Sequence, residues 1–355
     1  MNGDDEVSYY FDCFGSRCGA LVTGAGRAGT AAEAVALARR ALLSWHERFS
    51  RFLPDSELSR LNRDPRETVP VSPMLARFAK AVRDAASLSG GLVDATLLHE
   101  LERAGYERDL PDSVALSTAL SLAPARRPAA PAAQRWRELE VDLAAGTVTR
   151  PPGLALDSGG LAKGLFADAL GTTLATHPSF AINCAGDLLV GGAAGATRPI
   201  RVQSPFDGST LHSFELARTG VATSGIGRRS WLADDGAPAH HLLDPASGRP
   251  AFTGVVQATA LAPSALDAEI RAKAAVLSGP RAAPGWLPHG GVIVYDDGSH
   301  QVLAPVPVLT LSELAQHLPA ARGRGSDPRG TGSGHGARTP AGTVQATAGA
   351  GAVGS

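Results

Sequence analysis

The stretch ALDSGGLAKGLFADAL, residues 155–170, decides how we interpret this chain. It predicts a strand that delivers Asp157, a glycine-rich turn at 158–160, and a helix with Lys163 on its first turn. Glycine lets another group approach the backbone closely, and the free N–H groups of a helix start favour an anion. The stretch therefore suits a phosphate or pyrophosphate, although it has the spacing of neither a Walker A loop nor GxGxxG. The alternative interpretation is an ordinary strand-to-helix turn.

Strands and helices are mixed on both sides of this stretch without a strict βαβ rhythm, which favours an α+β fold. We expect one large unit over residues 1–320 and, because its composition is Gly, Ala, Arg, Ser, Thr and Pro, a disordered tail over 321–355. The expected helices follow a Thr30/Glu33 capping box and cover 73–88, 159–175 and 264–278. The expected strands cover 7–12, 18–24, 138–143, 146–150, 179–184, 199–204, 211–217, 240–244 and 254–262, with a last hairpin at 290–305.

Composition excludes several classes of protein. The 33 basic and 34 acidic residues among 355 give no basic field, so we expect no nucleic-acid binding. No apolar run is long enough to span a membrane, and the acidic start MNGDDEVSYYFD lacks the pattern of a signal peptide. We therefore expect a cytoplasmic protein. Its three cysteines lack the spacing of a zinc site.

Lysine and asparagine are scarce in a chain rich in Ala, Gly and Arg. The only lysines are Lys80, Lys163 and Lys273, and the only asparagines are Asn2, Asn62 and Asn183. A lysine kept among so many arginines suggests a place that needs a compact ammonium, although single residues also survive by chance.

Three more segments could carry chemistry, each with a plainer alternative. In SFAINCAGDLLVGG (179–192), Asn183 and Asp187 either line a site or stabilise a turn. In the pair GVATSGIGRRSW (220–231) and HHLLDPASGRP (240–250), Thr223 to Gly225, Arg228 and Arg229 could bind an anion, and His241 near Asp244 could act as a general base or lie on the surface. In the helix 264–279, Glu269 and Lys273 are four apart and should pair, commonly on a solvated face.

The order of these segments resembles that of the ApbE-type FAD:protein FMN transferases. The matching segments, over about Phe11 to Pro305, are FSRFLPDSELSRLN (49–62), GGLVDATL (90–97), LDSGGLAKG (156–164), INCAGD (182–187), VATSG (221–225) and HHLLDPASGRP (240–250). The resemblance implies a T-fold-related α+β domain with FAD in a central cleft. It further implies transfer of FMN from FAD to a Ser or Thr hydroxyl of a partner protein through a phosphoester bond, with release of AMP and help from Mg²⁺.

The resemblance also assigns roles to residues. His241 matches the histidine that we expect to activate the acceptor hydroxyl. Val93 stands where the family has an aromatic side chain, and Phe52 where a ring stacks. The positions matching FAD-contacting residues of the family are Phe14, Phe52, Leu92, Val93, Asp94, Asp157, Lys163 and Leu243.

The chain departs from the family at the implied metal site. The family's ADALST segment supplies Asp and Thr as Mg²⁺ ligands. A backbone carbonyl of the GG segment is the third ligand, and the corresponding residue in this chain is nearest to Gly160. This chain has Glu269 and Lys273 instead, and an ammonium cannot ligate a cation. We expect Lys273 to replace part of the metal's charge beside the pyrophosphate. Two alternatives to the transferase stay open: an FAD pyrophosphatase that makes FMN and AMP, and a non-catalytic FAD-binding protein.

Overall fold

The computed structural model describes residues 6–108, 113–131 and 135–305. The predicted tail at 321–355, and the end of the predicted unit at 1–320, lie outside these residues. In the described ranges the helices are α1 (Ala31–Phe49), α2 (Glu57–Arg63), α3 (Pro73–Leu88), α4 (Leu98–Arg103), α5 (Leu116–Leu122), α6 (Ala162–Leu174) and α7 (Ala265–Ser278), with short 3₁₀ helices at Arg135–Glu138, Ser158–Gly160 and Ala283–Trp286.

An eight-stranded antiparallel sheet forms the centre of the fold. Its strand order is β1-β2-β6-β7-β10-β15-β16-β17. The strands are β1 (Glu6–Cys13), β2 (Ser16–Thr23), β3 (Thr68–Pro70), β4 (Glu140–Asp142), β5 (Thr147–Thr149), β6 (Ser179–Cys184), β7 (Asp187–Gly191), β8 (Arg198–Gln203), β9 (Thr210–Leu216), β10 (Thr219–Gly225), β11 (Ser230–Leu232), β12 (Pro238–His240), β13 (Leu243–Asp244), β14 (Arg249–Pro250), β15 (Val255–Ala262), β16 (Gly291–Tyr295) and β17 (His300–Leu303).

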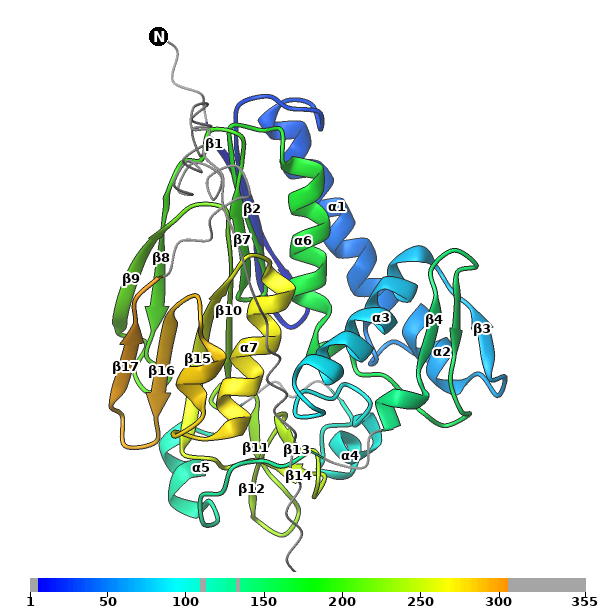
Figure 1. The fold of residues 1–355 in the computed structure, drawn as a ribbon, viewed down its shortest axis with the longest axis vertical. Coiled ribbons are helices and arrows are strands. Elements are labelled where there is room, and N and C mark those ends of the chain that lie inside the picture. The colour runs from blue at the N-terminus through cyan, green and yellow to red at the C-terminus, as the bar shows by residue number, and fades with distance from the viewer. Residues whose placement is uncertain (1–5, 109–112, 132–134, 306–355) are drawn as a thin grey trace, which may run out of the picture. The chain divides into compact units, whose positions relative to one another are not determined.

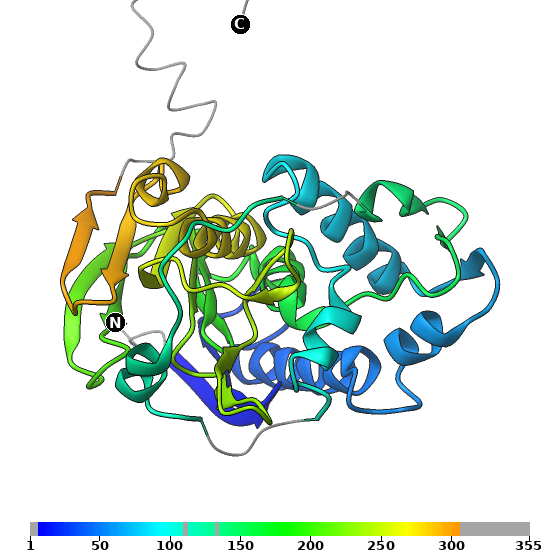
Figure 2. The ribbon, with the colours of Figure 1, turned by 90° about the horizontal axis from the view of Figure 1, so that it is seen from below.

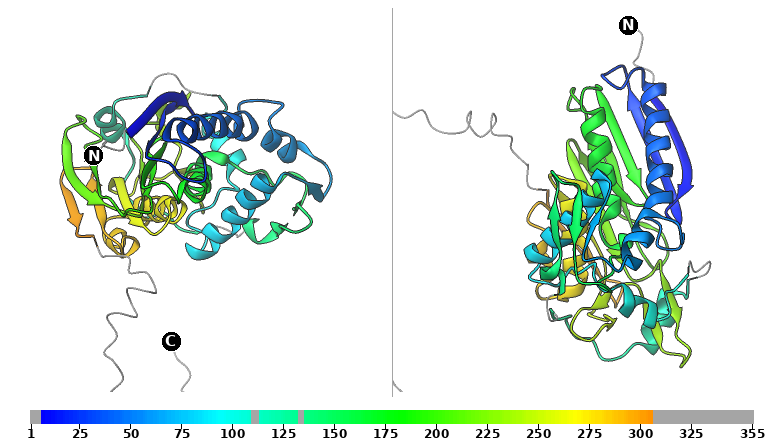
Figure 3. Two further views of the ribbon diagram at one scale, coloured as in Figure 1. Left: turned by 90° about the horizontal axis from the view of Figure 1, so that it is seen from above. Right: turned by 90° about the vertical axis from the view of Figure 1, so that its right-hand side faces the viewer.

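Three helices cover one face of this sheet. Figure 1 shows α1, α6 and α7 side by side along the strands, and the views in Figure 3 show α1 against β1 and β2. The capping box of Thr30 and Glu33 opens α1 as predicted. The rings of Phe49, Phe78 and Phe166 join α1, α3 and α6, with centroids 5.7 and 5.0 Å apart and no exposure above 1%. Through this aromatic contact, the hydrophobic core beneath the sheet is continuous with the core of the helices in the 50–110 segment.

The α+β prediction is confirmed, and most predicted elements are present. The strand predicted over 240–244 is wrong, because β12 ends at His240 and β13 begins at Leu243. The strand predicted to deliver Asp157 is also wrong, since residues 154–157 form no strand. Strands β11 to β14 lie at the same end of the fold as α4 and α5 (Figure 2). None of the helices in the described ranges combines the length and apolar character needed to cross a bilayer.

Candidate active site

The segment before α6 is held by side chains in place of a neighbouring strand. The Asn62 side chain accepts from the N–H of Leu156 and donates to its carbonyl, both at 2.9 Å. The N–H of Asp157 donates to the carbonyl of Ala95 at 2.9 Å, and its carboxylate accepts from the N–H of Gly159 at 3.3 Å. These bonds satisfy the extended backbone, so Asp157 is fixed at the mouth of the turn without a sheet.

Helices α6 and α7 are joined at their N-terminal halves. Asp168 of α6 accepts from the N–H groups of Ala265 and Leu266 at 2.7 and 3.0 Å, which caps α7 from outside. Gly164 makes this approach possible, because a Cβ atom there would lie 2.7 Å from backbone atoms of Ala265 and Leu266. The junction places Lys163 of α6 near the middle of α7.

Four charged residues meet at this junction, three of them buried and Lys163 partly buried, and we call Lys163, Asp187, Glu269 and Lys273 the buried ion cluster. Lys163 forms a salt bridge with Asp187 and lies 3.4 Å from Oε1 of Glu269. Lys273 lies 2.8 Å from the same oxygen. Glu269 is 0% exposed, Asp187 1% and Lys273 7%. Because buried charges must be paired, two ammonium and two carboxylate groups balance one another here.

The pKa values follow from this packing. Burial raises the pKa of Asp187 to about 6, although Lys163 opposes the shift. Burial also acts to raise the pKa of Glu269, but Lys273 and Lys163 outweigh it, and the pKa is lowered. The pKa of Lys163 is raised, because Asp187 and Glu269 outweigh the effect of burial. At pH 7, Asp187 and Glu269 are therefore mostly carboxylates, and Lys163 carries its proton.

Two cavities lie beside the cluster; together with the open solvent at their mouths they enclose about 560 and 750 Å³. The first cavity has a mainly leucine wall from the 92–101, 242–243 and α7 segments, and the second has an aromatic and basic wall from α1, the 50–52 segment and Tyr106. The residues that line both are Leu101, Asp157, Gly159 and His241.

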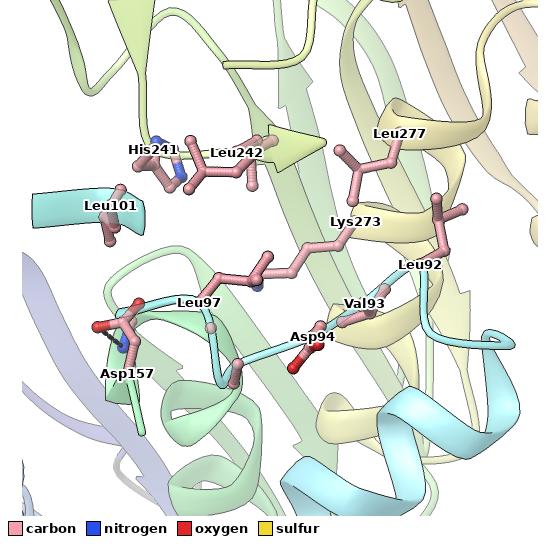
Figure 4. Close-up of a pocket in the computed structure, with 14 residues that line it drawn as sticks. Leu92, Val93, Asp94, Leu97, Leu101, Asp157, His241, Leu242, Lys273 and Leu277 are labelled. Atoms are coloured by element: carbon pink, nitrogen blue, oxygen red, sulfur yellow. Dashed lines mark hydrogen bonds between the residues drawn. The ribbon is translucent and has the colours of Figure 1, made fainter. Parts of the chain in front are cut away.

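Lys273 enters the first cavity from α7. Figure 4 shows its side chain reaching between the Leu92–Asp94 segment and the His241–Leu242 segment, toward the side that carries Asp157. Burial raises the pKa of Asp94, whose carboxylate accepts from Thr96. Because the rest of this wall is mostly leucine, Lys273 and Asp94 are well placed to orient a ligand.

The second cavity is lined by rings and cations. Phe14 lies at the turn between β1 and β2 with a φ of 55°, and its carbonyl accepts from Arg229 at 3.1 Å. Arg51 lies 4.3 Å from the centre of the Phe52 ring and 4.6 Å from that of Tyr106. Its Nε lies 3.4 Å from Asp157. Arg51 thus joins the aromatic wall to the residue shared by both cavities.

His241 is the imidazole at the junction of the cavities. Its Nδ1 is buried and makes no hydrogen bond, which leaves Nε2 as the nitrogen that a molecule in the cavities can reach. Burial, reinforced by Arg229, His240 and Lys273, lowers its pKa well below 6.5, so the ring is neutral at pH 7 and can accept a proton.

The pairing of His241 with Asp244 considered from the sequence is not present. The Asp244 carboxylate accepts from Ala130 N–H at 2.8 Å and from the Ser247 hydroxyl at 2.6 Å. It therefore stabilises the turn. Asn183 does the same at its own turn, where its side chain accepts from Gly186 at 2.8 Å.

Every site residue predicted from the family resemblance lines at least one of the two cavities, except Glu269. Glu269 lines neither cavity and lies behind Lys273. Sequence reasoning missed three features: Arg51, although it lies within the quoted segment 49–62, Tyr106, which lies in none of the quoted segments, and the burial of Asp187. The burial of Asp187 could have been inferred from its position as the first residue of the apolar run DLLVG. The residues predicted from the family resemblance that line at least one cavity are Phe14, Phe52, Leu92, Val93, Asp94, Asp157, Gly160, Lys163, His241, Leu243 and Lys273.

Comparison with known proteins identifies the family. The family model described as "ApbE family" matches residues 14–295. The chain belongs to the ApbE family. Two curated relatives are each named FAD:protein FMN transferase. That of Klebsiella pneumoniae (strain 342) is 28% identical over 150 residues, which is 41% of this chain and 43% of that protein. That of Escherichia coli (strain K12) is 29% identical over 150 residues, 41% of this chain and 42% of the relative. The match thus spans less than half the length of these relatives.

Solved structures show that the fold is that of ApbE proteins. The ApbE protein of Thermotoga maritima has a TM-score of 0.67 at 22% identity, covering 84% of this chain and 97% of that one. The flavinyl transferase ApbE of Pseudomonas stutzeri, in its apo form, has a TM-score of 0.67 at 21% identity, covering 85% and 96%. The predicted ApbE-like fold is therefore confirmed.

The residues at the metal position implied for an ApbE protein do not fit Mg²⁺. In the described part of the chain, no group of three or more His, Cys, Asp or Glu side chains is placed to hold a metal ion. Both oxygens of Glu269 have partners: Oε1 faces Lys273 and Lys163, and Oε2 accepts from Gly164 N–H at 2.9 Å. A divalent cation needs oxygen ligands, and here it would be repelled by two ammonium groups.

Proposed function

We propose that this protein binds FAD across the two cavities and transfers its FMN half to a Ser or Thr hydroxyl of a second protein, releasing AMP. Family membership supports the substrate, and the arrangement of charge supports the reaction. The observation that carries the proposal is the position of His241. This neutral imidazole lines both cavities and lies close enough to Arg229 and Lys273 for their charges to lower its pKa.

The reaction makes and breaks one bond at phosphorus. The acceptor oxygen forms a bond to the FMN phosphorus, the bond from that phosphorus to the bridging oxygen breaks, and AMP leaves with that oxygen. His241 takes the hydroxyl proton as general base. The catalytic requirement is to neutralise charge on the phosphates and to position the nucleophile, and the basic side chains at the junction supply that charge.

The two cavities suit the two halves of the dinucleotide. In the second cavity, Phe14, Phe52 and Tyr106 offer ring surface for an isoalloxazine, and Arg51 completes that wall. In the first, the leucine wall offers an apolar slot for adenosine, with Asp94 as its acidic group. The pyrophosphate would then lie near Asp157, Gly159 and His241. The aromatic side chain that Val93 lacks is not needed for this arrangement.

Incubation of the purified protein with FAD and a flavin-acceptor domain that exposes a Ser or Thr tests the proposal. Covalent flavin on the acceptor, together with AMP, is the expected result. The variant His241→Ala should lose labelling and keep FAD binding, and His300→Ala, at an exposed histidine of β17, should behave like the parent. AMP and free FMN without labelling would identify an FAD pyrophosphatase. FAD binding without AMP would identify a non-catalytic FAD-binding protein.

The remaining expectations stay predictions. The acceptor is a partner protein with an exposed Ser or Thr, nucleic acid is not a ligand, and the location is cytoplasmic.

A further inference from the structure

Lys273 and Glu269 form a pair that presents only its positive end to the first cavity. They are one turn apart on α7, and Nζ of Lys273 lies 2.8 Å from Oε1 of Glu269. Lys273 lines the cavity, whereas Glu269 is 0% exposed and lines neither cavity. A molecule in the first cavity therefore meets an ammonium group, with the carboxylate behind it.

Neither carboxylate of the buried ion cluster lines a cavity. Glu269 accepts from Lys273 and from Gly164 N–H, and Asp187 is paired with Lys163. An ammonium has three N–H donors, and one N–H of Lys273 suffices for Glu269. Two donors of Lys273 are then available to a ligand.

Cations from three separate elements converge on the junction of the cavities. Lys273 comes from α7, Lys163 from α6, and Arg229 from the segment between β10 and β11. The residues that line both cavities, among them Asp157 and His241, mark the place where the two cavities meet. This arrangement suits a doubly charged linker that runs from one cavity to the other, and a lysine is an effective point charge for phosphate.

We propose that Lys273 is the built-in cation of this site: its ammonium, held by Glu269, binds the pyrophosphate of FAD in place of a divalent metal, so that FAD binding is independent of Mg²⁺. This inference rests on the proposed function, because it takes FAD as the ligand. This role of Lys273 differs from a purely structural one. In a purely structural role Lys273 would only neutralise Glu269, and removing the lysine would leave the affinity for FAD unchanged.

Calorimetric titration of FAD into the full chain, with EDTA and with Mg²⁺ in excess, tests this role without measuring turnover. We expect the same dissociation constant in both buffers and no heat when Mg²⁺ alone is added. Lys273→Met should weaken FAD binding roughly 10- to 100-fold, the range for losing a hydrogen bond from a charged group. Lys80→Met removes an exposed lysine of α3 and should bind FAD like the parent.

A second variant is needed because Lys273→Met could misfold: it leaves the buried Glu269 carboxylate with Lys163 as its one remaining cationic neighbour among the described residues. The double variant Glu269→Gln/Lys273→Met removes both charges and should show the same loss of FAD affinity. Unchanged affinity in either folded variant, or parental FAD binding that requires Mg²⁺, would overturn the proposal. If both variants fail to fold, FAD binding by the parent that requires Mg²⁺ still overturns the proposal. Absence of FAD binding in every buffer would refute the proposed function and is thus a separate outcome.

Discussion

The backbone N–H of Gly164 donates to Oε2 of Glu269 at 2.9 Å, so α6 and α7 are joined directly beside the cavities. With Glu269 fixed from this side, its other oxygen faces Lys273 and Lys163. The orientations of both lysine side chains thus depend on how closely the two helices approach each other, and Gly164 makes this close approach possible.

Replacement of Gly164 by alanine should therefore destabilise the protein. A Cβ atom would lie 2.7 Å from backbone of α7, which cannot rotate away, and overpacking of this kind costs about 1–3 kcal/mol. Urea unfolding measures the loss. Gly285→Ala is the control, since a Cβ there meets nothing within 4 Å. Equal stability of the two variants would contradict the close approach.

Removal of Asp187 should cost far more than removal of an exposed acid. Asp187→Ala leaves Lys163 with Glu269 as its one remaining acidic neighbour among the described residues, and breaking a buried pair costs about 3–5 kcal/mol. The matched control is Asp84→Ala, which breaks the exposed pair with Lys80 and should cost at most about 0.5 kcal/mol. Denaturant midpoints at neutral pH compare them, and a loss for Asp187→Ala as small as the control's would refute the buried pairing.

Arg51→Lys should weaken FAD binding about tenfold. A lysine keeps the charge near Asp157 but loses the planar group that lies over Phe52 and Tyr106, and the two cations are not equivalent at a stacked site. Flavin fluorescence titration measures the affinity. Arg60→Lys, on the exposed face of α2, should have no effect, and an equally small change for Arg51→Lys would show that its stacking does not shape the cavity.

Local patterns were sufficient to predict most elements. Alternation identified β1 and β2, and the Thr30/Glu33 box identified the start of α1. The strand β10 was missed because its sequence, TGVATSG, consists mainly of small residues. Its place in the sheet comes from pairing with β7 and β15, contacts that no local pattern reports.

The sequence marked many of the residues that line the two cavities, but it did not indicate the burial of Glu269 and Lys273. The four-residue spacing indicated that Glu269 and Lys273 pair, but such spacing is equally typical of a solvated face. Only the packing of α7 against both the sheet and α6 decides for burial. Arg51 and Tyr106 meet through tertiary contacts between distant segments, and single residues of these types carry no signal in a sequence.

Acid should destabilise the protein through His240. Burial lowers the pKa of this 1% exposed histidine from 6.5 to about 3. Between these values the unfolded chain binds a proton that the folded chain does not, so stability falls as the pH is lowered, by about 1.4 kcal/mol per pH unit. Asp187 acts in the opposite sense between about 6 and 3.8, because its pKa is raised in the folded state.

A comparison of variants separates these two effects. In His240→Asn the amide oxygen can still accept from Leu242 N–H, the bond that His240 Nδ1 makes at 3.2 Å, but the titrating group is gone. The free energy of unfolding should then fall less steeply between pH 6.5 and 3. His300→Asn, at an exposed site, should keep the parental slope. A parental slope in His240→Asn would mean that His240 is not the group that titrates.

The rate of FMN transfer should stay constant as the pH falls to 6.5 and decline only below it. A general base must be neutral, and burial together with Arg229, His240 and Lys273 lowers the pKa of His241 well below 6.5. Since kcat/KM for FAD reports the free enzyme, its acid limb should follow this lowered pKa. Lys273→Met removes one of the repelling charges and should therefore move the acid limb to higher pH, whereas Lys80→Met should leave it in place. An acid limb centred at or above pH 6.5 in the parent, or unmoved in Lys273→Met, would show that His241 is not the base or that Lys273 does not act on it.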